Sequence, residues 1–295
     1  MMLRLILAAA LLMQAPASPP FDSNKAWEHL RQLVALGPRP AGSAAIEQSR
    51  AYIKKQLTAS GIAVAEQAWD DQTPTGRVHM VNLIATIPGT SKNRLVIGGH
   101  YDTKKFPFRF VGANDGGSSA AFLIELGRAL KGRTNRVPIE LLFLDGEEAV
   151  GEWQGTDHTY GSRYYVEAAR QSGTLGSIRA FVLVDMIGDR NLVIKREANS
   201  TPALTEAIWA AAKKLNRREF VAEITPIEDD HIEFLAAGVP SVDIIDLEYP
   251  DLTSRFWHTQ YDTIENVAAS SLQAVGDVLL AALPALETID ARRGR

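Results

Sequence analysis

The chain has 295 residues, of which 46% are hydrophobic and 22% are charged, so it can bury a substantial core and fits one large domain better than two. A formal net charge of −4 provides no broad basic surface, which excludes the electrostatic pattern of a nucleic-acid-binding protein and favours a small ligand or a peptide as partner. The absence of cysteine excludes disulfides and cysteine-ligated zinc, which leaves His, Asp and Glu as possible metal ligands.

The N-terminus has the pattern of a secretory signal peptide. Arg4 provides a positive start, an apolar run extends over 5–13, and Ala15-Pro16-Ala17 is a cleavage signal of the A-x-A type. This run is shorter than the ~20 residues that cross a bilayer, and no other segment is judged long and apolar enough to do so. We therefore predict a signal peptide over 1–17, a single domain over 21–295, export to the periplasm or the medium, and no membrane span after cleavage.

Two helices and then a series of strands are predicted along the chain. Trp27, Leu30, Leu33 and Leu36 recur at helical spacing, and a second helix over 44–60 stops at Gly61. Short apolar runs that end in polar residues, typical of strands buried on both faces, cover 78–87, 94–102, 138–146, 178–188 and 240–247. Further helices are predicted over 118–131, 160–171, 202–215, 230–237 and 268–287. This alternation predicts a three-layer α/β/α sandwich around a largely parallel mixed sheet.

Acidic residues and histidines gather at the predicted strand ends, where ligands bind in sheets of this kind. The set comprises His100, Asp115, Glu147, Glu148, Asp185, Asp229, Asp230, His231 and His258. A catalytic zinc takes three protein ligands of these types from separate loops and keeps one position open. A cation would also stabilise carboxylates that otherwise repel one another and tend to take up protons.

The adjacent acids Glu147 and Glu148 are expected to have different roles. Successive side chains near a strand end point in opposite directions, so one carboxylate can bind a metal while the other acts as general base and acid. Any one of these residues taken alone is more often a helix cap or a solvated loop residue. It is the joint placement that indicates a site.

The motifs around these residues resemble those of the zinc-dependent aminopeptidase-like superfamily and, within it, of the glutaminyl-peptide cyclotransferases. The resemblance extends from about His100 to Asn266. It rests on "HYDTKKF", "FVGANDGG", "DGEEAVGEW", "YGSR", "VDMIGD", "EDDHIEFLAAGVP" and "WHTQYDTIEN", which occur in the family's order. A zinc-exopeptidase-like fold is what the resemblance implies.

The resemblance implies one of two metal sites. The cyclase pattern has a single zinc held by Asp115, Glu148 and His258, with Asp185 and Asp229 in a hydrogen-bond network. The dizinc aminopeptidase pattern has Asp115 bridging two ions and adds His100 and Asp185 as ligands.

Several matches favour the cyclase. They are Trp153 after Glu148, "YGSR" at 160–163, the paired acids at 229 and 230, and Trp257 beside His258; the two tryptophans would form the walls of a small, water-poor substrate pocket. Glu228, where cyclases often have Gln, and the Gly116-Gly117 turn are departures, and the turn is closer to the peptidases.

The expected function is therefore conversion of an N-terminal glutaminyl residue of a peptide or protein to pyroglutamyl, with release of ammonia. The resemblance implies Glu147 as the proton-transferring residue, assisted by Asp185 and Asp229, and substrate binding by Trp153 and Trp257. The alternatives are an M28-type dizinc aminopeptidase and a non-catalytic binding domain on the same fold. The sequence gives no indication of the oligomeric state.

Overall fold

A six-stranded mixed sheet lies at the centre of residues 20–289, the part of the chain that this computed structural model describes. The order is β1-β2-β4-β3-β5-β8, with β1 Val64–Thr73, β2 Gly76–Ile87, β3 Arg94–His100, β4 Ile139–Leu144, β5 Ile178–Asp185 and β8 Ser241–Ile245. The pairs β3–β4, β3–β5 and β5–β8 are parallel, whereas β1–β2 and β2–β4 are antiparallel. The predicted mixed sheet is confirmed. The predicted signal peptide lies outside the described residues.

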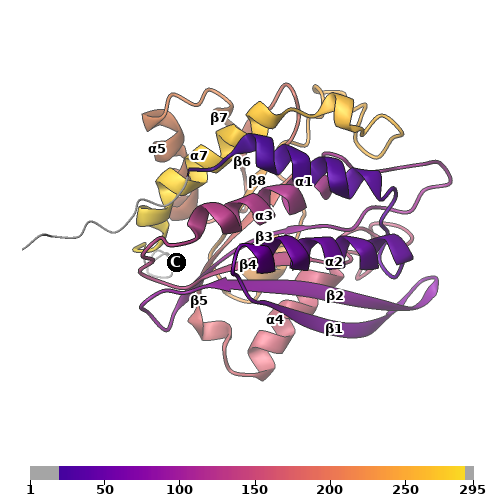
Figure 1. Ribbon diagram of the computed structural model, residues 1–295, viewed down its shortest axis with the longest axis horizontal. Coiled ribbons are helices and arrows are strands. Elements are labelled where there is room, and N and C mark those ends of the chain that lie inside the picture. Colours follow the sequence, from indigo (N-terminus) through magenta and orange to yellow (C-terminus); the bar gives the residue numbers. More distant parts are fainter. Residues whose placement is uncertain (1–19, 290–295) are drawn as a thin grey trace, which may run out of the picture.

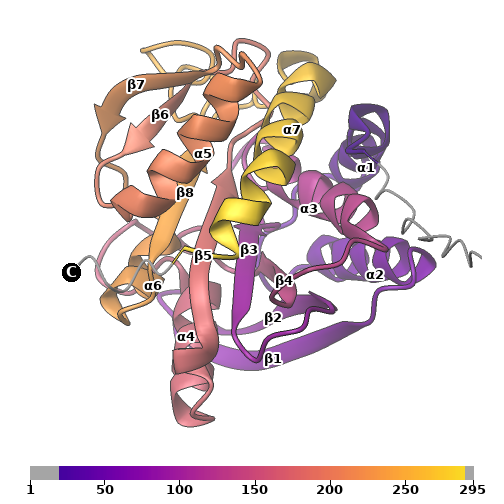
Figure 2. The same cartoon turned by 90° about the vertical axis from the view of Figure 1, so that its left-hand side faces the viewer.

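Helices cover both faces of this sheet, so the predicted three-layer sandwich is also confirmed (Figures 1 and 2). The larger core lies on the face covered by α1 Ser23–Ala35, α2 Ala44–Ala59, α3 Gly117–Leu130, α5 Pro202–Lys214 and α7 Ala269–Leu286. A smaller core on the opposite face contains side chains from α4 Tyr160–Gln171 and α6 His231–Ala236.

The central strands are continuous apolar runs because both of their faces are buried. In β3, Leu95 and Ile97 belong to the larger core, whereas Val96 between them belongs to the smaller one. Near its end, β3 packs closely against β5, since a Cβ atom on Gly99 would lie 2.5 Å from the carbonyl oxygen of Val184 on β5. This packing delivers His100 and Asp185, at the last positions of β3 and β5, to the same edge of the sheet.

Three strands were not expected from the sequence. The edge strand β1 is largely exposed, and β6 Ile194–Glu197 and β7 Phe220–Thr225 form a separate two-stranded parallel sheet. Their sequences lack the apolar runs of the central strands because these strands are only partly covered. Two predicted strands end earlier than expected. β3 and β5 end at positions 100 and 185, and the remainder of the predicted ranges 94–102 and 178–188 forms the loops of the site.

Contrary to the expectation from the sequence, α7 is long and apolar enough to span a membrane. This helix has 18 residues and a mean hydropathy of 1.4, which suffices by length and composition alone. Its inward side chains, among them Leu272, Val275, Leu279 and Leu283, are buried in the larger core. Since the core helix of a folded protein passes the same test, burial indicates a packing role.

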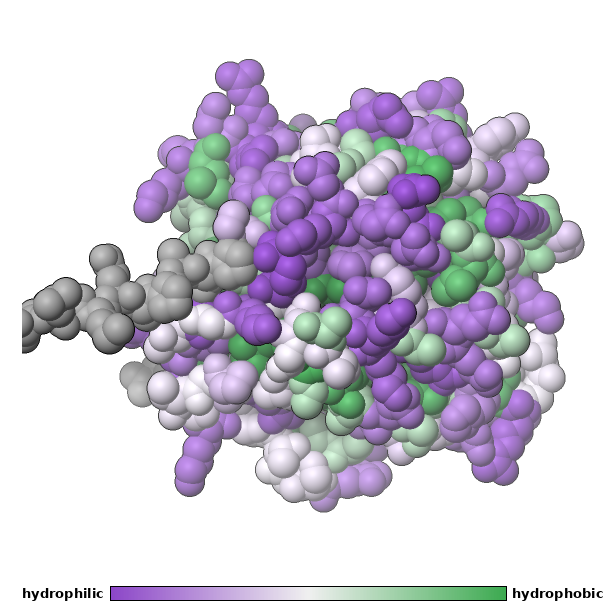
Figure 3. Space-filling view, in the orientation of Figure 1, coloured by the Kyte–Doolittle hydropathy of each residue, from purple (hydrophilic) through white to green (hydrophobic). Residues whose placement is uncertain are grey.

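The face drawn in Figure 3 is dominated by hydrophilic side chains, with apolar ones scattered among them.

Candidate functional site

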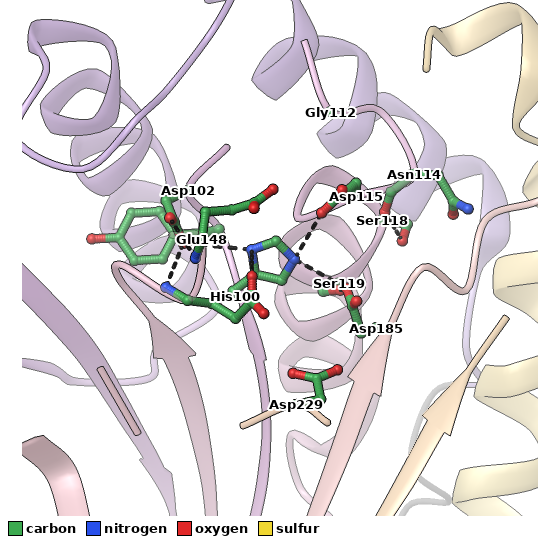
Figure 4. A network of polar contacts seen from close by, with 12 residues as sticks. His100, Asp102, Gly112, Asn114, Asp115, Ser118, Ser119, Glu148, Asp185 and Asp229 are labelled. Carbon is green, nitrogen blue, oxygen red and sulfur yellow. Dashed lines mark hydrogen bonds and ion pairs between the residues drawn. The ribbon is translucent and has the colours of Figure 1, made fainter. Parts of the chain in front are cut away.

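His100 lies at the centre of a buried group of carboxylates. Figure 4 shows that these carboxylates contact both sides of the imidazole ring. Its Nε2 atom is 3.2 Å from Oδ1 of Asp115 and 3.1 Å from Oδ1 of Asp185. Its Nδ1 atom lies 3.4 Å from Asp102 and 3.7 Å from Glu147. Burial lowers the pKa of His100, but the carboxylates of Asp185 and Glu147 outweigh burial and raise this pKa well above its usual value.

A second group shares Asp115 with the first. Nε2 of His258 lies 3.3 Å from Oδ2 of Asp115 and 3.2 Å from Oε1 of Glu148. Burial lowers the pKa of His258, whereas hydrogen bonds with these two carboxylates raise it to about 10. For Asp115, burial raises the pKa, and hydrogen bonds with His100 and His258 bring it below its usual value. The imidazole thus carries positive charge between two carboxylates, where a bound cation would replace its proton.

Both groups have donor atoms suited to a divalent cation. The candidate ligand atoms of Asp115, Glu148 and His258 lie within 4.8 Å of one another, and so do those of His100, Asp115 and Asp185. Imidazole nitrogen and carboxylate oxygen are the zinc ligands available to a chain without cysteine. The residues therefore fit one ion held by Asp115, Glu148 and His258, and a second ion held by His100 and Asp185 would share Asp115.

The neighbours Glu147 and Glu148 point to different partners, as expected from their positions. Glu148 contacts His258, whereas Glu147 approaches Nδ1 of His100. Burial raises the pKa of Glu147 well above its usual value; His100 opposes this shift, while Glu148 and Asp229 add to it. Glu147 is thus a buried carboxyl group with a strong tendency to hold a proton, and it belongs to neither of the candidate ligand groups.

Two further carboxylates position the backbone of the site. Asp102 accepts hydrogen bonds from the backbone N–H groups of Glu147 and Glu148, at 3.2 and 3.3 Å. Asp262 accepts those of Asn114 and Asp115, at 2.8 and 3.1 Å. Sequence reasoning gave these acids no role. Each acid follows a candidate histidine at short range, in "HYD" and "WHTQYD", but these motifs do not indicate which backbone N–H groups the acid accepts.

Positive φ angles mark two positions at the rim of the site. Met186, directly after Asp185, has φ 47°, and His258 has φ 54°. Residues other than glycine seldom adopt this left-handed conformation, and where they do the surrounding structure must hold them in it. For His258, the rings of Phe106 and Phe110 supply part of that support at 5.4 and 5.8 Å from the imidazole.

Eight of the residues predicted for the site line one pocket of about 230 Å³, which also has apolar walls. The predicted residues are Asp115, Glu147, Glu148, Trp153, Asp185, Asp229, Trp257 and His258, and the apolar ones include Ile227, Ile245 and Leu247. His100 is not among the lining residues. Asp230 and His231, which the sequence grouped with these residues, are fully buried and do not line the pocket either.

The two tryptophans stand at the pocket wall with defined orientations. Trp153 stacks on His158 with ring centroids 4.2 Å apart, and its Nε1 atom donates a hydrogen bond to Glu228 at 3.2 Å. Trp257 stacks on His258 at 4.3 Å and keeps 38% of its surface exposed. An aromatic surface therefore lies directly beside the candidate metal ligands.

Comparison with known proteins identifies relatives over most of the chain. The model of peptidase family M28 matches residues 82–283. A glutaminyl-peptide cyclotransferase from Bothrops jararaca is 32% identical, over 84% of this chain and 76% of its own length. The crystal structure of a glutaminyl cyclase from an Acidobacteriales bacterium superposes with a TM-score of 0.86 at 37% identity and covers 95% of this chain and 99% of its own. That of a Zn-dependent exopeptidase from Parabacteroides distasonis ATCC 8503 has a TM-score of 0.81 at 25% identity, with coverages of 92% and 100%.

Proposed function

This chain belongs to peptidase family M28 and, within it, to the glutaminyl-peptide cyclotransferases, and from that premise we propose that it converts N-terminal glutaminyl residues of peptides or proteins to pyroglutamyl residues with release of ammonia. The observation that carries this proposal is that the indole rings of Trp153 and Trp257 line the same small pocket as the carboxylates and the imidazole of the candidate metal ligands. A glutamine side chain must fold back on its own α-amine to react, and a confined apolar pocket favours that conformation.

In this proposal, Asp115, Glu148 and His258 hold one zinc ion. Bound there, zinc supplies Lewis-acid polarisation of the carbonyl group of the substrate side chain. The support is the proximity of the three ligand atoms and the buried excess of carboxylate that a cation would balance.

Glu147 transfers the proton. The α-amine attacks the side-chain amide carbon, a C–N bond forms, and Glu147 accepts a proton from the attacking nitrogen. The same carboxyl group then delivers the proton to the amide nitrogen, which leaves as ammonia as its C–N bond breaks. The burial of Glu147 beside the ligands supports this role.

Asp185 and Asp229 share the proton with Glu147 and adjust the pKa of Glu147. Burial raises the pKa of Asp229 well above its usual value, and Asp185 adds to the shift. Figure 4 shows the Asp229 carboxylate next to that of Asp185. Since Asp229 also raises the pKa of Glu147, these two buried acids titrate together rather than one at a time.

The test is an ammonia-release assay on a Gln-initiated dipeptide, with product masses recorded and a chelator control. Ammonia with an intact peptide bond supports the proposal. A free amino acid as product would instead establish the second candidate, a dizinc aminopeptidase.

One observation favours that second candidate. The ligand atoms of His100, Asp115 and Asp185 have the geometry of a further metal site. In the peptidase, Glu147 would activate water against the first peptide bond. Metal analysis separates the two functions, since the cyclase is expected to bind one zinc per chain and the peptidase two.

The leader and the domain organisation form part of the same proposal. Residues 1–17 are a signal peptide, residues 21–295 are one domain, and the mature protein acts in the periplasm or outside the cell on peptide or protein N-termini. Measuring the N-terminus of the mature protein tests the cleavage after Ala17.

A further inference from the structure

Three fully buried ionisable side chains lie behind the reaction pocket and have no part in the mechanism above. Glu197 is the last residue of β6, His231 the first of α6, and Asp243 lies within β8. The side chains of Glu197 and His231 have no exposed surface, and Asp243 is likewise fully buried. Charged groups this deep are costly unless they are paired, so their protonation states are strongly constrained.

Glu197 accepts hydrogen bonds only. Its carboxylate oxygens receive the backbone N–H of Asn199 at 2.9 Å, the hydroxyl of Ser200 at 2.9 Å and Nε2 of His231 at 3.0 Å. Burial raises the pKa of Glu197, but the hydrogen bonds from His231 and Asn199 reduce it to about 2. An ionised Glu197 needs donors from every partner, which places a proton on Nε2 of His231.

The other nitrogen of His231 faces Asp243. Nδ1 lies 3.6 Å from Oδ2 of Asp243, and among the described residues neither Nδ1 nor either oxygen of Asp243 has a hydrogen-bond partner within 3.5 Å. Burial raises the pKa of Asp243 well above its usual value, and Asp229 and Asp185 add most to that shift, followed by Glu197 and Asp230. A protonated Asp243 can donate to the lone pair of Nδ1 with a small closing movement.

This group is connected to the pocket in two ways. Asp229, on the pocket wall, is the carboxylate whose charge acts most strongly on Asp243. Glu197 also accepts the backbone N–H of Ile227 at 3.3 Å, and Ile227 lines the pocket two positions before Asp229. Changes in the buried group therefore reach the wall segment that carries Asp229.

We infer that Glu197, His231 and Asp243 form a buried positioning triad, in which ionised Glu197 fixes the Nε2–H tautomer of His231, His231 accepts a hydrogen bond from neutral Asp243, and the triad holds Asp229 in place for the reaction. The inference rests on the proposed function, because it assigns Asp229 to the cyclisation. The three residues are positioning residues, since none of them lines the pocket.

The experiment uses the zinc-loaded full-length mature protein and compares Asp243→Asn with Asp243→Ala. Asparagine keeps the shape and supplies an amide N–H donor in place of the carboxyl O–H of a neutral Asp243, so D243N is expected to retain kcat within about threefold and to keep its melting temperature. Alanine removes the donor, and D243A is expected to lose about 10- to 100-fold in kcat, as supporting residues behind a metal site typically do, with a smaller change in KM. The matched control is Glu125→Gln, another fully buried acid, on α3, which is expected to leave kcat unchanged.

Histidine NMR of the ¹⁵N-labelled wild-type protein provides a readout that needs no turnover. The His231 signal, assigned by its loss in His231→Gln, is expected to show the Nε2–H tautomer of a neutral ring. An imidazolium or an Nδ1–H tautomer overturns the triad as stated, and so does a D243N protein as impaired as D243A. If D243A does not fold, the tautomer and the D243N kinetics decide the matter. A wild-type protein that releases no ammonia refutes the proposed function alone, because the tautomer is measured independently.

Discussion

The imidazole of His258 meets the carboxylate of Glu148, with Nε2 and Oε1 3.2 Å apart, although the two residues are separated by 110 positions in the chain. Asp115 lies 3.3 Å from the same nitrogen. One candidate ligand therefore comes from the loop before α3, one from the loop after β4 and one from the segment before α7. Single substitutions therefore test the metal-binding role of this group, because each candidate ligand can be removed without disturbing the elements that carry the other two.

Replacing His258 with alanine is expected to weaken zinc binding by more than about 100-fold and to abolish ammonia release, because only two of the three ligands remain. Zinc content after gel filtration, measured by mass spectrometry of the metal, checks this directly. His79→Ala is a suitable control, since His79 pairs with Asp70 on the exposed β1–β2 hairpin. A His258→Ala protein that retains stoichiometric zinc would remove His258 from the ligand set.

Glu147→Gln is expected to keep its zinc and lose activity. The amide cannot accept a proton from the attacking amine, and general acid–base groups typically contribute about 10²- to 10⁴-fold to the rate. Steady-state kinetics together with metal analysis of the same preparation provide the measurement. Wild-type turnover by this variant would refute the role given to Glu147.

Trp257→Ala is expected to raise KM, by up to about tenfold, with little effect on zinc content. The indole contributes a stacking surface beside His258, and such aromatic contacts are worth about 0.5–1.5 kcal/mol. The control is Trp209→Phe, because Trp209 lies on α5 and outside the pocket. Equal KM values for Trp257→Ala and the wild type would show that substrate does not use this wall.

Asp246 is expected to make the stability of the native state depend on pH. It is buried, accepts the backbone N–H groups of Val193 and Glu248, and has a pKa raised by burial from the usual 3.8 to about 7. Between these two values the native state binds more protons than the unfolded state, so the stability that Asp246 contributes is present at low pH and is lost as the pH rises toward 7.

Denaturant unfolding of the wild type and of Asp246→Asn from pH 4.5 to 7.5 measures this dependence. Relative to the wild type, the variant is expected to gain up to about 1.4 kcal/mol for each pH unit as the pH rises from 4.5 toward 7, and little more above 7. The exposed Glu152→Gln is the control and should follow the wild type. A constant difference between Asp246→Asn and the wild type at every pH would contradict the raised pKa.

Sequence patterns were informative where burial is complete. The apolar runs that became β3 and β5 are buried on both faces, so composition alone predicted them, and the acids at their ends led to the pocket. The edge strand β1 escaped prediction because residues such as Glu66 and Asp70 face solvent, where strand formation depends on pairing with β2.

The roles of Asp102, Asp262 and Glu197 could not be predicted for a different reason. Each carboxylate acts by accepting backbone N–H groups, and for Asp102 and Asp262 the donors are distant in the sequence. Such contacts leave no pattern in the side chains of the donors. The wall residue Trp153 was predicted from the motif around it, whereas no motif indicated that His158 would be its stacking partner.

The distance along the chain between Glu148 and His258 also bears on how the protein matures. No short segment contains the three candidate ligands, so a growing or partly translocated polypeptide cannot assemble them, and their approach depends on slow, non-local contacts. Metal loading must then follow folding, in whichever compartment folding is completed. Under the proposed function, the supply of zinc in that compartment, rather than at the ribosome, would set the fraction of molecules that become active.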